Sequence, residues 1–383
     1  MNSVTTVAPE VGEKLVAVTI SDVASAAGVS RGAVSLALNG HAGVGDQTRQ
    51  RILETAKALG WTPNLRAKSL RSAKAYAVGL VIAREAKLLG SDPFFPSFIA
   101  GVEVTLEKHD YTLVLTVATE PGAEERSYRR LADGGRVDGV ILSDVRHDDS
   151  RIALLRGLGL PAVTLNRPDT PSPFPAVCMD DAVGITAAVE HLISLGHTRI
   201  GHVGGEQVYL HGRSRRRAWQ SALTAAGLGT DLFAEADFTA PGGVAATARL
   251  LARKDRPTAI VYANDLMATA GQSYAQAHGM NVPGDLSITG YDNAQFARYL
   301  NPPLTTIAAD PLAWGRLAAA MLLGQVSGTH DGGDLILGPP RLVVRSSTGE
   351  VPKHAVPAVA VDRYEDLSTA ELSQESIHCQ EKQ

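Results

Sequence analysis

Pairs of polar residues stand at the ends of several short apolar stretches of this chain, and their side chains could bind a polar ligand. Amide, guanidinium and carboxylate groups can each hydrogen-bond adjacent hydroxyls, so together they suit a polyhydroxylated ligand without excluding a nucleobase. Asp265 and Asp292 could instead cap helices, as Asp near a strand–helix turn often does. The pairs are Asn166-Arg167 after "PAVTL", Asn264-Asp265 after "TAIVYA" and Asp292-Asn293 after "LSITGY".

The N-terminal part of the chain is basic and could bind a polyanion. Residues 18–74 contain eight Lys or Arg and three Asp or Glu, a net charge of +5, whereas the rest of the chain carries −9. A small basic head on an acidic body is typical of proteins in which the head binds nucleic acid. Chance clustering of surface charge is the alternative.

Catalysis and metal binding have little support in the sequence. The chain lacks a GxSxG elbow, an HExxH motif and a GxxxxGK[ST] loop. Its 11 histidines show no ligand spacing, and its two cysteines, Cys178 and Cys379, lie far apart. We therefore expect no catalytic residues, no metal, no cofactor and no enzymatic activity.

The basic head is predicted to contain two short helices joined by a turn. Thr19 or Ser21 can cap the first helix, and Gly28 permits the positive φ of a turn. Ser30 can cap a second helix that runs to about Leu38. This arrangement is typical of a helix-turn-helix. A third helix is predicted over 47–59, with one apolar face formed by Ile52, Leu53, Ala56 and Leu59.

The body alternates apolar runs with helical stretches, which predicts two parallel-sheet subdomains. One helical stretch is expected from Phe98 to His109. No apolar run approaches the roughly 20 residues of a membrane helix, and the N-terminus has no secretory signal. We expect a reduced cytoplasmic protein without membrane contact. The buried strands are predicted at 77–82, 112–117, 138–143, 161–166, 199–205, 258–265 and 286–293.

The head and the segment that follows it resemble the DNA-binding headpiece and hinge of the LacI/GalR family of bacterial transcription regulators. The matching stretches are "VTISDVASAAGVSRGAVSLALNG", "TRQRILETAKALGWTPN" and "AKSLRS". The resemblance covers residues 18 to about 349 and implies a helix-turn-helix headpiece and a periplasmic-binding-protein-like, two-lobed α/β body with three crossovers. The domains we expect are a flexible extension (1–17), the helix-turn-helix domain (18–62), a hinge helix and linker (63–76), the effector-binding and dimerisation domain (77–349) and a disordered tail (350–383).

The resemblance assigns DNA contacts to the head and the hinge. In the family, paired hinge helices enter the minor groove and a leucine, here Leu70, wedges into a base step. Leu36 stands where the family commonly has an arginine that reads guanine, so it can contact only a thymine methyl. The operator sequence therefore does not transfer from the family. The expected DNA-binding residues are Thr19, Ser30, Arg31, Gly32, Ser35, Leu36, Asn39, Asn64, Ala67, Lys68 and Leu70.

The resemblance also assigns effector contacts to a cleft between the two lobes. The positions of Arg215, Asn264 and Asp292 contact the effector in the family, and Phe238 matches a position where an aromatic ring can lie against a sugar. Packing in the core is the alternative for Phe238. The expected effector-binding residues are Asp92, Phe94, Asn166, Arg167, Arg215, Phe238, Asn264 and Asp292.

The function predicted from these features is a DNA-binding repressor whose operator affinity is changed by a small molecule. Two heads of a homodimer would read a pseudo-palindromic operator in double-stranded DNA. A sugar or sugar derivative is the expected effector, and a nucleobase or nucleoside co-repressor is an alternative. A cytosolic solute-binding module without DNA function is a further alternative.

Overall fold

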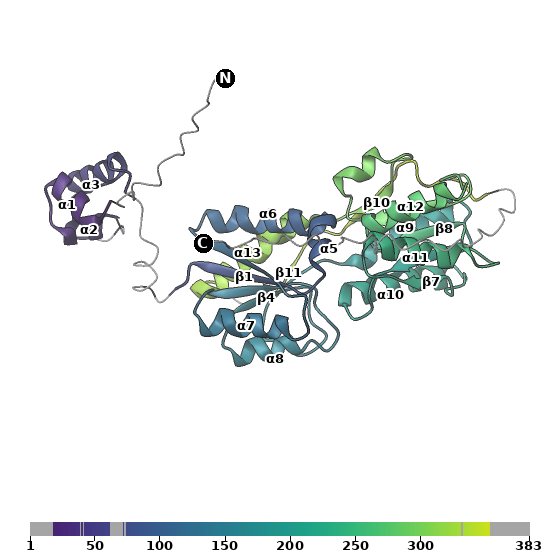
Figure 1. Cartoon of the computed structure of the whole chain (residues 1–383), viewed down its shortest axis with the longest axis horizontal. Coiled ribbons are helices and arrows are strands. Elements are labelled where there is room, and N and C mark those ends of the chain that lie inside the picture. Colours follow the sequence, from purple (N-terminus) through teal and green to yellow (C-terminus); the bar gives the residue numbers. More distant parts are fainter. Residues whose placement is uncertain are drawn as a thin grey trace, which may run out of the picture. The chain divides into compact units, whose positions relative to one another are not determined.

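The computed structural model describes residues 18–352 except 39, 41, 62–71, 73 and 331. The chain divides between Lys74 and Ala75 into two compact units, a small helical headpiece and a large α/β body (Figure 1). The expected hinge helix and the segments 1–17 and 353–383 lie outside the described residues.

The headpiece consists of three helices around a small apolar core. They are α1 (Ile20–Ala27), α2 (Arg31–Leu38) and α3 (Asp46–Ala58). Thr19 caps α1 in a reciprocal capping box: the Asp22 amide donates to the Thr19 hydroxyl, and the Thr19 amide donates to the Asp22 carboxylate. Gly28 ends α1 with φ +65°, as the turn requires. The core is formed by Val23, Ala24, Ala27, Val34, Ala37, Ile52 and Ala56.

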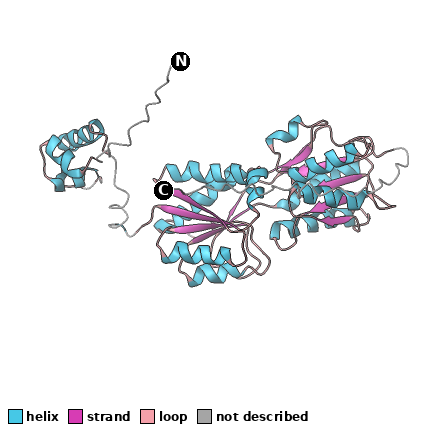
Figure 2. Ribbon diagram, viewed as in Figure 1, coloured by secondary structure: helices cyan, strands magenta, loops and turns pink. Residues whose placement is uncertain are grey.

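The body contains two lobes, each a six-stranded sheet with helices on both faces (Figure 2). The N-terminal lobe has the strand order β11-β5-β4-β3-β1-β2 and is covered by α6 and α13 on one face and α7 and α8 on the other (Figure 1). Its elements are β1 (Ala77–Ile82), α5 (Ala86–Ser91), α6 (Phe94–Glu107), β2 (Thr112–Val117), α7 (Ala123–Asp133), β3 (Gly139–Leu142), α8 (Ser150–Gly157), β4 (Ala162–Leu165), β5 (Ala176–Cys178), α13 (Pro311–Ser327) and β11 (Leu335–Ile336).

The C-terminal lobe repeats this design with the strand order β12-β10-β9-β8-β6-β7. Helices α9 and α10 pack together, as do α11 and α12. All neighbouring strands pair in parallel except β10 and β12. The elements are α9 (Asp181–Ser194), β6 (Ile200–Gly204), α10 (Leu210–Ala225), β7 (Phe233–Glu235), α11 (Ala240–Leu251), β8 (Ala259–Tyr262), α12 (Asp265–Ala277), β9 (Ser287–Tyr291), the 3-10 helix η1 (Gln295–Tyr299), β10 (Thr305–Ala308) and β12 (Arg341–Val343).

The chain crosses between the lobes three times, after β5, after β10 and after β11. The two-lobed parallel-sheet fold and its three crossovers confirm the fold expected from the resemblance. In both lobes the first five strands lie in the order 2-1-3-4-5, a doubly wound arrangement whose ligand site is expected at the carboxyl ends of its central strands.

Several local predictions were wrong. Strand β2 forms where expected but is half-exposed, because it lies at the edge of its sheet. Helix α6 includes the expected stretch from Phe98 but begins at Phe94, within the segment 92–95 that was also expected to begin a helix, and the Asp92 carboxylate accepts a hydrogen bond from the Phe94 amide. Leu53 and Leu59 do not join the headpiece core and stay about 40% exposed.

Replacement of Gly28 by Ala should destabilise the headpiece by about 1 kcal/mol, because a side chain at φ +65° is strained although the added Cβ has free space around it. The Val34 amide should then exchange its hydrogen about fivefold faster, as measured by hydrogen–deuterium exchange.

The matched control is Gly32→Ala within α2, where the backbone is helical and the nearest atom to the new Cβ is the Ser30 hydroxyl at 3.7 Å. Alanine favours a helix over glycine, so this variant should exchange no faster than the parent. Equal destabilisation by both substitutions would contradict the assignment of strain to the turn.

Candidate functional site

A pocket lies between the two lobes of the body, at the carboxyl ends of their central strands. The N-terminal lobe contributes residues that follow β1, β3 and β4, and the C-terminal lobe contributes residues that follow β8 and β9. This cleft pocket is lined by Arg84, Leu88, Asp92, Phe94, Phe95, Ser143, Asp144, Leu165, Asn166, His211, Arg215, Phe238, Asn264, Asp292 and Trp314.

All of the expected effector-binding residues line the cleft pocket except Arg167. The guanidinium of Arg167 pairs with the Asp334 carboxylate and donates to the Phe174 carbonyl, 2.9 Å away. These bonds hold Arg167 at the edge of the N-terminal lobe, beside β5 and β11. The structure therefore gives Arg167 a role in joining the β4–β5 loop to the segment before β11.

Arg215 is held in place by protein groups on several sides. Its guanidinium donates to the Asp181 carboxylate at 3.0 and 3.1 Å and to the Ala263 carbonyl, and it lies 3.7 Å from the centre of the Tyr291 ring. Burial alone would lower the pKa of Arg215, but the Asp181 carboxylate outweighs it and the pKa is raised. Arg215 thus stays charged, with much of its donor capacity used.

Arg84 is the other guanidinium of the pocket and was not expected from the sequence. It donates to Asp144 at 2.9 and 3.1 Å and to Glu206 at 2.7 Å. Burial would raise the pKa of Asp144, but Arg84 outweighs it and lowers the pKa to about 2. The pair therefore remains ionised.

Asp92 and Asp292 are the carboxylates without a cationic hydrogen-bond partner in the pocket. Asp92 accepts one bond, from the Phe94 amide at 3.0 Å. No side-chain bond of Asp292 to the described part of the chain is recorded, and its backbone has φ +110°. Burial, and then in Asp292 the proximity of Asp92, raises the pKa of both carboxyls. These two groups are available to accept hydrogen bonds from a ligand.

The side chains of Asn166 and Asn264 in the pocket form hydrogen bonds with backbone groups. Asn264 caps α12, where its Oδ1 accepts from the Met267 amide at 2.9 Å and its Nδ2 donates to the Phe238 carbonyl at 3.0 Å. Asn166 has φ +70° and accepts from the Met179 amide at 2.8 Å. Asn264, rather than Asp265, is therefore the helix cap.

Aromatic rings form the apolar walls of the pocket. Phe94 stacks on Phe98 and meets Trp314 edge-on. Phe238 lies 5.1 Å from the His211 ring, and burial lowers the pKa of His211 to about 4, so this imidazole is neutral. Rings on both sides and acceptors between them suit a flat, hydroxyl-bearing ligand.

Two of the lining residues that were not expected lie just after strands, as Asn166, Asn264 and Asp292 do. Arg84 comes two residues after β1 and Asp144 two residues after β3, at the carboxyl ends of adjacent central strands. The strand ends were readable in the sequence, but the order of the strands in the sheet was not. His211 lies in the first turn of α10, which carries no such signal.

The candidate DNA-binding surface is the exposed side of α2. Ser30 accepts from the Ala33 amide at 3.1 Å and so caps the helix. Thr19, Arg31 and Gly32 are exposed. Ser35 and Leu36 are half-buried, with Leu36 against the Gly43 backbone. The expected contacts at Asn39, Asn64, Ala67, Lys68 and Leu70 lie outside the described residues.

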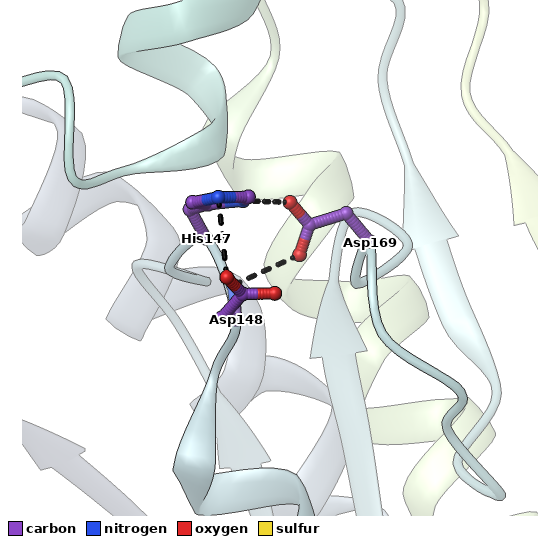
Figure 3. Close-up of side chains that lie close together, drawn as sticks. All are labelled: His147, Asp148 and Asp169. Carbon is purple, nitrogen blue, oxygen red and sulfur yellow. Dashed lines mark hydrogen bonds and ion pairs between the residues drawn. The ribbon is translucent and has the colours of Figure 1, made fainter.

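Two further features bear on ligands and on membranes. Within the described ranges, His147, Asp148 and Asp169 form one surface group whose side chains carry atoms that could bind a metal ion. The His147 imidazole bonds to both carboxylates (Figure 3).

No helix in the described part of the chain is long and apolar enough to cross a membrane.

Replacement of Asp292 by Asn should stabilise the protein at high pH. A carboxyl whose pKa is raised on folding favours the folded state at low pH, and this contribution is lost as the pH rises from about 4 through the folded pKa. The variant should therefore unfold at a higher temperature than the parent at pH 8, and the melting temperatures of the two should converge near pH 4.

Asn tolerates the positive φ of this position, so the backbone is preserved. Asp310→Asn is the control, because Asp310 caps α13 by accepting from the Ala313 amide and Asn caps equally well. A melting difference that did not vary with pH would contradict the buried-charge explanation.

Comparisons with known proteins agree with this geometry. The model of the "Bacterial regulatory proteins, lacI family" matches residues 19–64, and that of the "Periplasmic binding protein-like domain" matches residues 189–348. The solved CelR–cellobiose complex has a TM-score of 0.68 at 33% identity and covers 86% of this chain and 99% of that one. The lac repressor dimer bound to operator and the anti-inducer ONPF has a TM-score of 0.75 at 27% identity, covering 87% and 99%.

Relatives that this chain matches over most of their length are named as transcriptional regulators. The transcriptional regulator CelR of Thermobifida fusca is 34% identical over 314 residues, 81% of this chain and 92% of its own. The transcriptional repressor CytR of Escherichia coli K12 is 33% identical over 339 residues, covering 88% and 98%. These relatives are regulators rather than enzymes, as expected. The chain belongs to the LacI family of bacterial transcriptional regulators, which bind DNA through a helix-turn-helix headpiece.

Proposed function

We propose that this regulator is a repressor whose operator affinity is changed by a neutral sugar bound in the cleft pocket. The observation that carries the proposal is the distribution of charge. The guanidinium groups of Arg84 and Arg215 are paired with protein carboxylates, whereas Asp92 and Asp292 remain available as acceptors. A ligand that donates hydrogen bonds therefore suits this pocket.

Sugar hydroxyls meet this requirement, and the rings of Phe94, Phe238 and Trp314 suit the apolar faces of a sugar. A phosphorylated ligand would bring negative charge into a pocket whose two guanidinium groups are already paired with protein carboxylates. The similarity to a regulator solved with cellobiose supports the same class. A nucleoside, which also carries hydroxyls and can stack on rings, is the second candidate.

The regulator works as a homodimer in this proposal. The edge strand β2 exposes Leu115 and Val117, and Val104 is exposed on α6. Exposed apolar residues at an open sheet edge favour association. The similarity to the lac repressor dimer supports the same arrangement. Two headpieces would then read the halves of a pseudo-palindromic operator in the bacterial cytoplasm.

The DNA contacts come from α2 and from the hinge that follows α3. Arg31 and Ser35 contact phosphates or base edges, Leu36 contacts a thymine methyl, and Leu70 acts as the minor-groove wedge. Effector binding in the cleft changes the relation of the lobes and so the placement of the hinges. This works only because the effector binds the two arrangements unequally.

A thermal-shift screen of the full-length protein tests the ligand class, with cellobiose, maltose, glucose 6-phosphate and cytidine as probes. A neutral disaccharide should raise the melting temperature, since a ligand at a hundredfold excess over its Kd stabilises by about 2.7 kcal/mol. Asp92→Ala and Asp292→Ala should abolish the shift.

Asp231→Ala is the control, because Asp231 is exposed and pairs with Arg253 outside the pocket. A shift with glucose 6-phosphate but not with the disaccharides would overturn the neutral-sugar proposal, and a shift with cytidine alone would favour the nucleoside.

An operator selected from random duplex DNA tests the headpiece. Binding should weaken steeply with salt, because phosphate contacts release counterions. Leu36→Ala should relax the base preference at one position of each half-site and weaken binding about tenfold or more. Leu53→Ala, which truncates an exposed leucine of α3, should change neither.

A chain lacking residues 1–75 should not bind the operator but should still show the ligand-induced melting shift. If the truncated body retained operator binding, or if Leu36→Ala and Leu53→Ala behaved alike, the assignment of α2 as the reading helix would be wrong.

A further inference from the structure

The two lobes touch at a place that none of the three crossovers passes through. Loop 144–149, which follows β3 in the N-terminal lobe, lies against residues 206–210 at the start of α10 in the C-terminal lobe. The His147 amide donates to the Val208 carbonyl, and the Leu210 amide donates to the Val145 carbonyl, both at 2.9 Å. Arg146 and Tyr209 form an antiparallel bridge between these bonds. A short two-stranded pairing thus joins the lobes.

Arg84 adds a charged contact across the same junction. Its side chain comes from the N-terminal lobe, where it is paired with Asp144, and it donates to Glu206 of the C-terminal lobe at 2.7 Å. Its guanidinium also lies 3.7 Å from the centre of the Tyr209 ring. A planar guanidinium can serve a carboxylate at its edge and an aromatic ring at its face simultaneously.

Loop 144–149 is held rigidly by its own lobe. The Asp149 carboxylate accepts from the Arg146 amide at 2.9 Å and pairs with Arg151 at 2.6 Å. Glu124 on α7 pairs with both Arg146 and Arg151 at 2.7 Å. The loop therefore presents its backbone to the other lobe at little further cost in conformational entropy.

The surface group of His147, Asp148 and Asp169, seen in Figure 3, further restrains loop 144–149. The His147 imidazole bonds to the Asp169 carboxylate at 2.5 Å, and the Asp148 amide donates to the same carboxylate at 3.1 Å. Asp169 lies in the loop after β4, so the group ties two loops of the N-terminal lobe together. His147 thus has its side chain fixed in one lobe and its amide bonded to the other.

We propose that Arg84, Glu206 and Tyr209, with the paired segments 145–147 and 208–210, form a latch that keeps the two lobes closed on the cleft pocket before any ligand binds. Arg84 and the adjoining Asp144 and His211 line the pocket, so the latch is also part of its wall. Opening the pocket for a ligand requires these contacts to break together. The latch thereby controls ligand entry and release and does not depend on the ligand's identity.

Hydrogen–deuterium exchange on the full-length, ligand-free protein tests this proposal directly, because the amides of His147 and Leu210 report whether the lobes are joined. Glu206→Gln removes the charge that Arg84 meets across the junction and leaves the Arg84–Asp144 pair intact. Exchange of both amides should become about tenfold faster, as expected when a partly buried ionic hydrogen bond becomes one to a neutral acceptor. Tyr209→Leu, which removes the ring under Arg84, should have the same effect.

Glu125→Gln is the matched control, since Glu125 pairs with Arg129 within α7 and both side chains are more than half exposed. It should leave the two amides unchanged. In all variants the buried amides of β3 and β8 should exchange at the parental rate, because each lobe remains folded.

Unchanged exchange at His147 and Leu210 in both latch variants would overturn the proposal. Equal acceleration in β3 and β8 would also overturn it, because the residues would then stabilise the lobes themselves rather than their closure. Neither readout involves DNA or an effector, so the result is separable from the proposed sugar-responsive repression.

Discussion

The burial of two guanidinium groups between the lobes is the constraint on which the ligand pocket depends. A charge removed from water must be paired, and Arg84 and Arg215 meet that requirement with Asp144, Glu206 and Asp181. These pairings use much of the donor capacity of the two guanidinium groups, and Asp92 and Asp292 are the pocket carboxyl groups without a cationic hydrogen-bond partner. The proposed preference for a ligand that donates hydrogen bonds rests on this charge balance of the whole cleft.

The fold brings these charges together by repeating one design. Each lobe places the strands that bear polar residues at the centre of a doubly wound sheet, so that the carboxyl ends of β1 and β3 face those of β8 and β9 across one pocket. Three crossovers join the lobes, and the proposed Arg84 latch adds a contact between them at a different place. A ligand that replaces or strengthens these contacts would shift the balance between open and closed arrangements.

Much of the fold was predictable because its signals are local. Apolar runs alternate with helical stretches, Gly28 stands at the turn of the headpiece, and Thr19 stands at its first cap. The exposure of β2 was not predictable, because its composition resembles that of the central strands and only the strand order puts it at an edge of the sheet. Arg167 follows a strand like Asn166 does, yet its pairing with Asp334 keeps it out of the pocket.

By itself the sequence determined the helix-turn-helix and the two parallel-sheet lobes, because residue spacing and strand ends are properties of neighbouring residues. Its resemblance to the family indicated most of the polar groups expected in the cleft. Only the tertiary structure decided which charges meet. Arg84 lies 122 positions before Glu206, and the Asp181 that holds Arg215 lies 34 positions before it. Such pairings depend on strand order and lobe contact, and they settle which groups of the pocket remain available to a ligand.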